Sequence, residues 1–323
     1  MATNSERRAV SVRCVLGDDV LLLRRMRGQE SLSALSEYVL ELYSERADLQ
    51  VDALLATTIG VRVDLPRGGL REFNGYITRC ALTGRQGRYS TYQVTVRPWL
   101  WFLTRSPRSR AFRALGVLDI VEAILSPYAC ADIDCSSLRA RYPPLPDCVQ
   151  EHESDFDFLS RLLERAGIHY FFRSAADRHT MVLADCVDCH LPAPGYGSLC
   201  YLPVAGAATY SSEVVYQWHM SAELAASACG QFEPRHAIQR QAQAATRARG
   251  VSAGALFKLT GHPHVDRRRD HLIVHAAFVL APVSHTPMAE ERTEAELDCT
   301  FSVVDPHDYY GPPAPTRTSQ GGR

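Results

Sequence analysis

The sequence predicts a mainly β protein of the α+β class, in which a small helix-containing region separates two stretches of strands. Residues 15–103 consist of short apolar or alternating runs that end in Gly- and Pro-rich turns, which is typical of an antiparallel barrel or sandwich. Residues 117–125 and 153–167 instead carry apolar side chains at helical spacing, and strand-like runs return after residue 168. With 323 residues, 46% of them hydrophobic and 22% charged, the chain is long enough for two or three domains with cores of their own.

The first β stretch contains two clear strands and one ambiguous turn. Residues 61–65 alternate strictly between apolar and polar side chains before Pro66, and residues 91–97 are rich in Thr and Val. The Asn74-Gly75 pair has two readings, either a hairpin turn or a bulge inside one longer strand, because residues 71–82 read as continuous.

The best-specified element is a helix at residues 153–167 that runs directly into a strand. Ser154 can accept a hydrogen bond from an N–H group of the first turn, and Asp155 and Asp157 place negative charge at the positive end of the helix dipole. The apolar stripe of this helix consists of Phe158, Leu159, Leu162, Leu163 and Ala166. Gly167 supplies the left-handed residue that closes the helix, and the β-branched and aromatic residues that follow predict a strand.

A second helix is predicted just before this element. One apolar face runs through residues 117–125 and is ended by Ser126-Pro127, after which a Cys- and Pro-rich loop spans residues 130–146. Residues 104–175 therefore form a small α/β insert between two β regions.

The second β stretch is less regular. A last short strand is predicted to begin at Cys299. Residues 239–248 are almost all Ala, Gln and Arg, which predicts a helix. The tail from residue 305 is rich in Pro, Gly and Thr and predicts a linker.

Charge and composition exclude several classes of protein. The net charge is −1, and the one dense basic run, at residues 267–269, is flanked by Asp266 and Asp270, so nothing indicates a nucleic acid partner. The N-terminus lacks the apolar segment of a signal peptide, and no window is apolar enough to cross a membrane. We expect a protein made in the cytoplasm, with its ten cysteines reduced.

One cysteine cluster admits a metal or haem interpretation. Cys186-Val187-Asp188-Cys189-His190 has the spacing of a haem-attachment signature, but haem attachment of this kind belongs to exported chains. Zinc is the stronger alternative, because Cys186, Cys189, His190 and Cys200 offer thiolate and imidazole ligands for a tetrahedral site. A single Cys pair with one further Cys is a weak signal, so we expect no cofactor and no metal.

The sequence offers little sign of catalysis. It contains no Gly-rich phosphate loop and no His-Glu-x-x-His. Asp155 and Asp157 are better explained as helix-capping residues than as an acid and base pair. The sequence therefore predicts a protein that is not an enzyme and has no catalytic residues.

Several motifs, in this order, resemble the hub region of the VgrG spike proteins of type VI secretion systems, which is similar to the tail hub of contractile phages. The motifs are the Gly-Gln-Glu-Ser-Leu-Ser run at 28–33, Arg-Glu-Phe-Asn-Gly-Tyr-Ile-Thr at 71–78, Val-Arg-Pro-Trp-Leu-Trp-Phe-Leu at 96–103, the 153–172 joint, and Phe-Lys-Leu-Thr-Gly-His-Pro at 257–263. The resemblance covers roughly residues 20–310 and implies strands at residues 180–185, 214–220, 257–263 and 272–275.

The resemblance implies two β-barrel hub domains separated by the helix-containing insert. The implied divisions are an N-terminal segment (1–17), a first barrel (18–103), the insert (104–175), a second barrel (176–303) and a linker (304–323) towards an OB-fold and needle. Between residues 222 and 247 the chain is shorter than the family pattern, so we expect a shortened second barrel. We also expect either a truncated spike or a stand-alone hub that docks to a separate needle.

The function implied is structural. A homotrimer of two-barrel chains would present a pseudo-sixfold face to a hexameric Hcp-type tube, with baseplate proteins and a spike or effector as further partners. Assembly would take place in the secretion apparatus, with possible delivery into a target cell. Two alternatives stay open: a phage or phage-derived tail hub, and a small metal-binding protein that uses Cys186, Cys189, His190 and Cys200.

Overall fold

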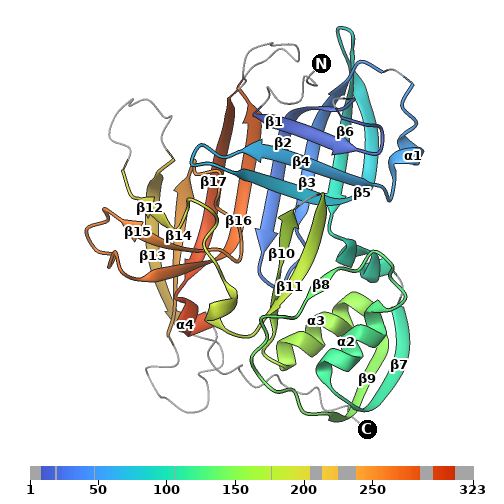
Figure 1. The fold of residues 1–323 in the computed structure, drawn as a ribbon, viewed down its shortest axis with the longest axis vertical. Coiled ribbons are helices and arrows are strands. Elements are labelled where there is room, and N and C mark those ends of the chain that lie inside the picture. The colour runs from blue at the N-terminus through green and yellow to red at the C-terminus, as the bar shows by residue number, and fades with distance from the viewer. Residues whose placement is uncertain are drawn as a thin grey trace.

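The computed structural model describes residues 9–18, 20–46, 48–105, 107–175, 177–203, 213–224, 238–283 and 294–309. Figure 1 shows a large curved sheet above a smaller region that contains the helices α2 and α3. Within these ranges the sheet has twelve strands, of which six precede the helical region and six follow it. None of the helices in these ranges has the length and apolar character needed to cross a membrane.

The N-terminal half of the sheet is antiparallel throughout. Its strands, in spatial order, are β1 (Val10–Cys14), β4 (Thr58–Asp64), β5 (Leu70–Gln86), β6 (Tyr89–Arg97), β3 (Glu37–Ser44) and β2 (Leu22–Ser31), with the one-turn helix α1 (Val51–Leu54) before β4. Strand β5 runs straight through Asn74 and Gly75, which pair in register with Gly60 and Ile59 of β4. The pair is therefore part of one continuous strand, as the second interpretation expected, and the hairpin interpretation is wrong. The register shifts of β5 lie further along, after Ile77 and Leu82, in its pairing with β6.

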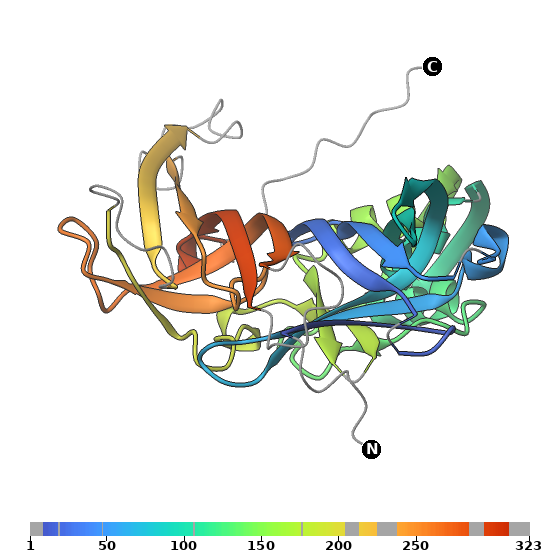
Figure 2. The ribbon, with the colours of Figure 1, turned by 90° about the horizontal axis from the view of Figure 1, so that it is seen from above.

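The C-terminal half continues the same sheet. Its strands are β16 (Asp270–Pro282), β17 (Ala295–Val304), β14 (Ile238–Thr246) and β13 (Val215–Leu224), and β12 (Ser198–Cys200) and β15 (Leu256–Thr260) join at the side of β16. Figure 2, seen from above, shows these strands at one end of the molecule and the blue N-terminal strands at the other. The short helix α4 (Pro306–Tyr309) follows β17, and the rest of the predicted linker lies outside the described residues.

The two halves are joined by a seam between β2 and β16. Residues from Met26 to Ser31 pair with residues from Leu280 to His275 in an unbroken antiparallel register. One hydrophobic core extends across the seam into both halves. Gly28 has no side chain, and the ring of Phe278 occupies the space that a Cβ there would need.

The predicted pair of barrels is not confirmed, because no closed barrel is found among the described strands. The N-terminal half does curl, since β1 and β2 at its two ends approach within 8 Å between Cα atoms. They do not pair with each other, however. The edge of β2 that does not pair with β3 pairs with β16 instead. The hydrogen bonds that would close one barrel therefore join the two halves into one sheet.

The α/β region has a separate core and two small sheets. Its elements are the 3₁₀ helix η2 (Trp99–Arg105), β7 (Pro107–Leu115), α2 (Val117–Leu125), β8 (Ile133–Asp134), β9 (Leu145–Ser154), α3 (Asp155–Arg165), β10 (His169–Ala175) and β11 (Arg178–Ala184). The two helices predicted in this region, α2 and α3, are confirmed. In α3, Ser154 Oγ accepts a 3.0 Å hydrogen bond from Asp157 N, and Gly167 adopts the expected left-handed conformation at φ +69°.

The helix predicted at residues 239–248 is wrong, because this segment forms β14 in the interior of the sheet. It pairs with β13 on one side and β17 on the other, so its backbone groups are satisfied by neighbours. Ala242 and Ala244 are buried, whereas Gln243 is exposed. The sequence reads as helical because alanine and glutamine favour helices locally, and tertiary pairing overrides that preference.

Candidate functional site

The cysteine cluster lies at the end of β11. Cys186 precedes the single 3₁₀ turn η3 (Val187–Cys189), and its Sγ lies 3.2 Å from Sγ of Cys189. The carboxylate of Asp185 lies beside them, and the three ligand atoms fall within 4.8 Å of one another. Burial, the neighbouring thiol of Cys189 and the charge of Asp185 raise the pKa of Cys186 to about 11, so this thiol is protonated at neutral pH.

The carboxylate of Asp185 already has several hydrogen-bond donors. It accepts from the backbone N–H groups of Arg139 and Ala140, the latter at 2.7 Å, and from the hydroxyl of Tyr142 at 2.8 Å. Burial raises the pKa of Asp185, but these hydrogen bonds outweigh it and lower the pKa overall. The carboxylate therefore holds the loop at residues 139–142 against the end of β11.

The other two predicted zinc ligands lie elsewhere. His190 is buried, with Nδ1 2.7 Å from the carbonyl oxygen of Gly254 and its ring stacked on Phe171 at 5.2 Å. Burial lowers the pKa of His190. Cys200 is exposed on β12. The structure thus brings together Cys186 and Cys189 but neither His190 nor Cys200.

Asp185 was missed as a member of the cluster. The sequence signal that points to it is its position directly before Cys186, at the end of a predicted strand. Only thiolate and imidazole side chains were considered as zinc ligands, so this carboxylate was left out.

Motif residues of the N-terminal half join its strands to one another and to the C-terminal half. Glu30 of β2 accepts hydrogen bonds from the hydroxyl of Tyr38 at 3.1 Å, from Arg71 of β5 at 3.1 Å and from the backbone N–H of Ala253. The guanidinium of Arg71 also lies 4.5 Å from the ring centre of Phe73. The side chain of Glu30 is only 14% exposed, so this carboxylate is matched by buried donors rather than offered to a ligand.

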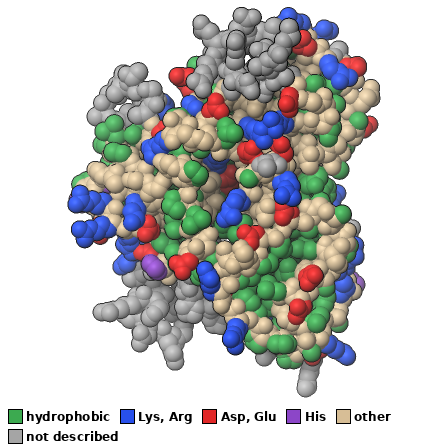
Figure 3. Space-filling view, in the orientation of Figure 1, with side chains coloured by type: hydrophobic (Ala, Val, Ile, Leu, Met, Phe, Trp, Pro, Cys, Tyr) green, Lys and Arg blue, Asp and Glu red, His purple; other side chains and the backbone are tan. Residues whose placement is uncertain are grey.

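A cleft of about 380 Å³ opens above Glu30 and Arg71. Its walls come from β5, β10 and the segments at residues 191–194 and 250–255, and exposed Leu70 and Leu191 lie at its rim. Figure 3 shows acidic atoms deep in a hollow near the centre of this face. At the bottom of the cleft the carboxylate of Glu30 pairs with Arg71 and accepts a hydrogen bond from the hydroxyl of Tyr38.

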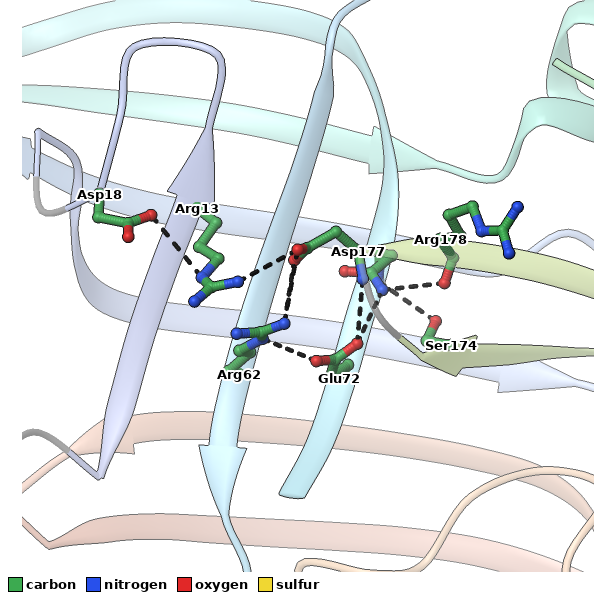
Figure 4. A network of polar contacts seen from close by, with 8 residues as sticks. Arg13, Asp18, Arg62, Glu72, Ser174, Asp177 and Arg178 are labelled. Atoms are coloured by element: carbon green, nitrogen blue, oxygen red, sulfur yellow. Dashed lines mark hydrogen bonds and ion pairs between the residues drawn. The ribbon is translucent and has the colours of Figure 1, made fainter. Parts of the chain in front are cut away.

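A second polar network attaches the β10–β11 hairpin to the sheet (Figure 4). Arg62 of β4 donates to Glu72 of β5 at 2.7 Å and lies 3.4 Å from Asp177 in the hairpin turn, while Arg13 of β1 reaches Asp177 at 3.1 Å. Asn74 adds a 2.9 Å hydrogen bond from its amide to the carbonyl oxygen of Arg178. This network shows why a run such as Arg-Glu-Phe-Asn-Gly needs these polar side chains inside a strand.

Gly75 lies at the next close approach. A Cβ at this position would lie 2.7 Å from the carbonyl oxygen of Arg97, so a larger residue would displace β6. Gly75 therefore keeps β5 and β6 close together, while Arg62, Glu72 and Asn74 hold the β10–β11 hairpin against the sheet.

Comparison with known proteins agrees with this architecture. The model of the phage tail baseplate hub (GPD) family matches residues 29–231. The chain belongs to the phage tail baseplate hub family. In line with that membership, it is 32% identical to the type VI secretion system spike protein VgrG1b of Pseudomonas aeruginosa over 93% of its own length, and 32% identical to VgrG1a of the same organism over 90%.

These matches cover only part of the relatives. The hub-family chain spans 47% of VgrG1b and 53% of VgrG1a, which is about half the length of each. The suspected likeness to the hub region of VgrG spike proteins is thereby confirmed.

Solved structures share the fold. The Escherichia coli c3393 protein, a component of the type VI secretion system with structural similarity to the T4 tail proteins gp27 and gp5, superposes with a TM-score of 0.70 at 18% identity. That superposition covers 94% of this chain and 78% of c3393. The 43 kDa tail protein of prophage MuSo2 from Shewanella oneidensis superposes with a TM-score of 0.62 at 14% identity, covering 94% and 99% of the two chains. At such identities the likeness establishes the fold alone.

Proposed function

We propose that this chain is the structural, non-enzymatic hub of a type VI secretion spike. The observation that carries the proposal is the 32% identity to VgrG1b, which extends over 93% of this chain and so includes both halves of the sheet. The motif residues support the same view, because Glu30, Arg71 and Asn74 are engaged in holding the architecture. Function then depends on shape and on assembled surface.

The architecture supports assembly as a homotrimer. Six strands precede the α/β region and six follow it, so each chain carries two comparable sheet units. We take these units as the counterparts of two hub barrels, residues 18–103 and 176–303, with residues 104–175 as the insert between them. Three copies around a threefold axis would present six units, which matches the symmetry of a hexameric Hcp-type tube.

The surface supports protein partners rather than nucleic acid. On the face in Figure 3, acidic and basic side chains are interspersed, and the net charge of the chain is −1. Baseplate proteins, a needle and an effector are the further partners of this proposal. The protein would be made in the cytoplasm and assembled in the secretion apparatus.

Light scattering tests the proposal. The mass in solution is measured for the chain alone, for the chain mixed with the matching tube protein, and for a mixture with an unrelated hexamer as the control. A trimer, or a monomer that joins the tube ring but not the control hexamer, is the expected result. A monomer that ignores the tube protein would overturn the adaptor role of this chain.

A phage or phage-derived tail hub is the second candidate. It is favoured by the hub-family model and by the prophage MuSo2 protein, whose chain is covered almost completely. Light scattering with a phage tail tube protein as a further partner separates the two, because a hub of this kind would bind that protein in preference to the Hcp-type tube.

A further inference from the structure

The turn around Cys186 and Cys189 has a geometry that the hub architecture does not require. The backbone N–H of Cys189 lies 3.4 Å from the carbonyl oxygen of Cys186, as in a tight turn. Residues three apart in such a turn have Cα atoms less than about 7 Å apart, and disulfides need about 4.4–6.8 Å. The two Sγ atoms already lie 3.2 Å apart, so a small side-chain rotation closes the bond.

We propose that Cys186 and Cys189 form a reversible disulfide by exchange with a small-molecule disulfide of the glutathione class. This inference does not depend on the hub proposal, because it rests only on the local turn and the two thiols. In a Cys-x-x-Cys pair the second thiol is placed to attack a mixed disulfide formed on the first.

The exchange has two balanced steps. First, Cys186, whose raised pKa leaves only a small thiolate fraction at neutral pH, loses its proton and attacks one sulfur of oxidised glutathione, which forms a mixed disulfide and releases one glutathione thiolate. Cys189 then attacks the Cys186 sulfur, which closes the internal disulfide and releases the second glutathione. The two thiol protons go to the two glutathione molecules, and two electrons move from the protein to the oxidant.

The order of the steps follows from exposure. Cys186 is partly exposed and can meet a dissolved disulfide, whereas Cys189 is only 4% exposed. Cys189 Sγ lies 3.2 Å from the carbonyl oxygen of Ser137, on the side of the loop that Asp185 holds. Cys186 is therefore the entry point, and Cys189 resolves the mixed disulfide from within.

A metal site is the competing use of this cluster, and its ligand set is incomplete. Among the described residues, the cluster contains three potential ligands, while structural zinc requires four. Asp185 is engaged by two backbone donors and a hydroxyl, and His190 is turned to Gly254. Because the two thiols lack a complete set of zinc ligands, the cluster favours disulfide formation over metal binding.

The experiment uses the full chain, purified reduced and equilibrated with defined ratios of reduced to oxidised glutathione. Free thiols are then alkylated, and the denatured protein is cleaved on the N-terminal side of aspartate. Asp188 lies between the two cysteines, so this cleavage separates Cys186 from Cys189 unless a disulfide links them. Mass spectrometry should find the linked fragments as the oxidised fraction rises, and they should separate after reduction.

Two single variants test the order of attack. Cys189→Ser should accumulate glutathione on Cys186 as a stable mixed disulfide. Cys186→Ser should leave the buried Cys189 largely unmodified. Cys200→Ser is the matched control, because it removes an exposed thiol of β12 and should not change the amount of linked fragment.

Three results would overturn the proposal. One is full alkylation of both cysteines at every glutathione ratio in the wild-type chain. Another is a disulfide from Cys186 to a different cysteine. The third is one bound zinc per chain that protects both thiols from alkylation and is released only when Cys186 or Cys189 is replaced.

Discussion

Helix α3 and strand β14 are of similar length, 11 and 9 residues, yet different physics determines each. For α3 the cap, the apolar stripe and the closing glycine all lie within residues 154–167. In β14 nothing local favours a strand, and the conformation comes from pairing with β13 and β17. The comparison teaches that local sequence specifies an element whose own residues supply its ends and buried face, whereas an interior strand can depend on its neighbours.

The largest expected effect is at the buried face of α3. Phe158 is fully buried and stacks on Phe112 at 5.7 Å between ring centres, and Leu162 is 3% exposed. Phe158→Ala or Leu162→Ala should lower the free energy of unfolding by about 2–5 kcal/mol, because each leaves a cavity. Denaturant unfolding measures this, with exposed Glu164→Ala as the control; a change near zero at Phe158 would show that α3 does not pack as a core helix.

At β14 the corresponding test replaces a small buried side chain by a larger one. Ala244 is 5% exposed and lies directly opposite Trp218 on one side and Phe301 on the other. Ala244→Leu should cost about 1–3 kcal/mol of stability, because the strand has no room for a larger side chain. Unchanged thermal unfolding in this variant would contradict the buried position of β14.

Acid should weaken the core beside α3 through His179. Its Nε2 accepts a 2.8 Å hydrogen bond from the backbone N–H of Trp99, which requires an unprotonated ring. Burial lowers the pKa of His179 to about 4, so the unfolded chain binds the proton first as the pH falls. Stability is complete above the ordinary histidine pKa of about 6.5 and should fall by about 1–2 kcal/mol between pH 7 and pH 5.

Variants separate His179 from the other histidines. His179→Gln keeps an acceptor for Trp99 but cannot titrate, so unfolding curves at the two pH values should lie closer together than in the wild type. Exposed His264→Gln is the control and should keep the wild-type pH dependence. An equal pH dependence in all three proteins would place the acid sensitivity elsewhere.

The cap of α3 offers a smaller effect. Ser154→Ala removes the acceptor for Asp157 N and should cost about 0.5–2 kcal/mol. Ser154→Asn should recover most of the loss, because asparagine also caps helices. Equal melting temperatures for the Ala and Asn variants would show that the cap contributes little.

The smallest expected effect has the opposite sign. Gln243 is exposed on β14, so Gln243→Thr should stabilise the protein by up to about 1 kcal/mol, since threonine favours strands. The same change would destabilise a helix. A lower melting temperature would therefore support the local preference of this segment over its place in the sheet.

Much of the fold could be predicted from the sequence, but only where the signal is local. The α3 joint, α2 and the strands at 61–65 and 91–97 carried their own periodicity and end signals. Strands β7 and β9 were missed, because β7 is rich in exposed arginine and β9 lies partly in a segment that reads as a Pro-rich loop. The seam was missed because β2 and β16 show no preference for each other in a single sequence.

The candidate zinc ligands show the same difference between positions set by local spacing and positions set by distant contacts. The spacing of Cys186 and Cys189 within one turn fixed their proximity. His190 and Cys200 could not be placed from spacing, because the direction of the His190 ring depends on Gly254, far away in the chain, and Cys200 depends on the pairing of β12 with β15.

The seam also sets a condition on how the protein is made. Ser31 and His275 are hydrogen-bonded neighbours that lie 244 positions apart in the chain. During synthesis β2 is therefore made well before β16, its partner at this edge. At about 5–20 residues per second, the delay is on the order of tens of seconds. For that interval the nascent chain exposes an unpaired strand edge, and the strand of a second nascent chain that pairs with it would give a misassembled pair.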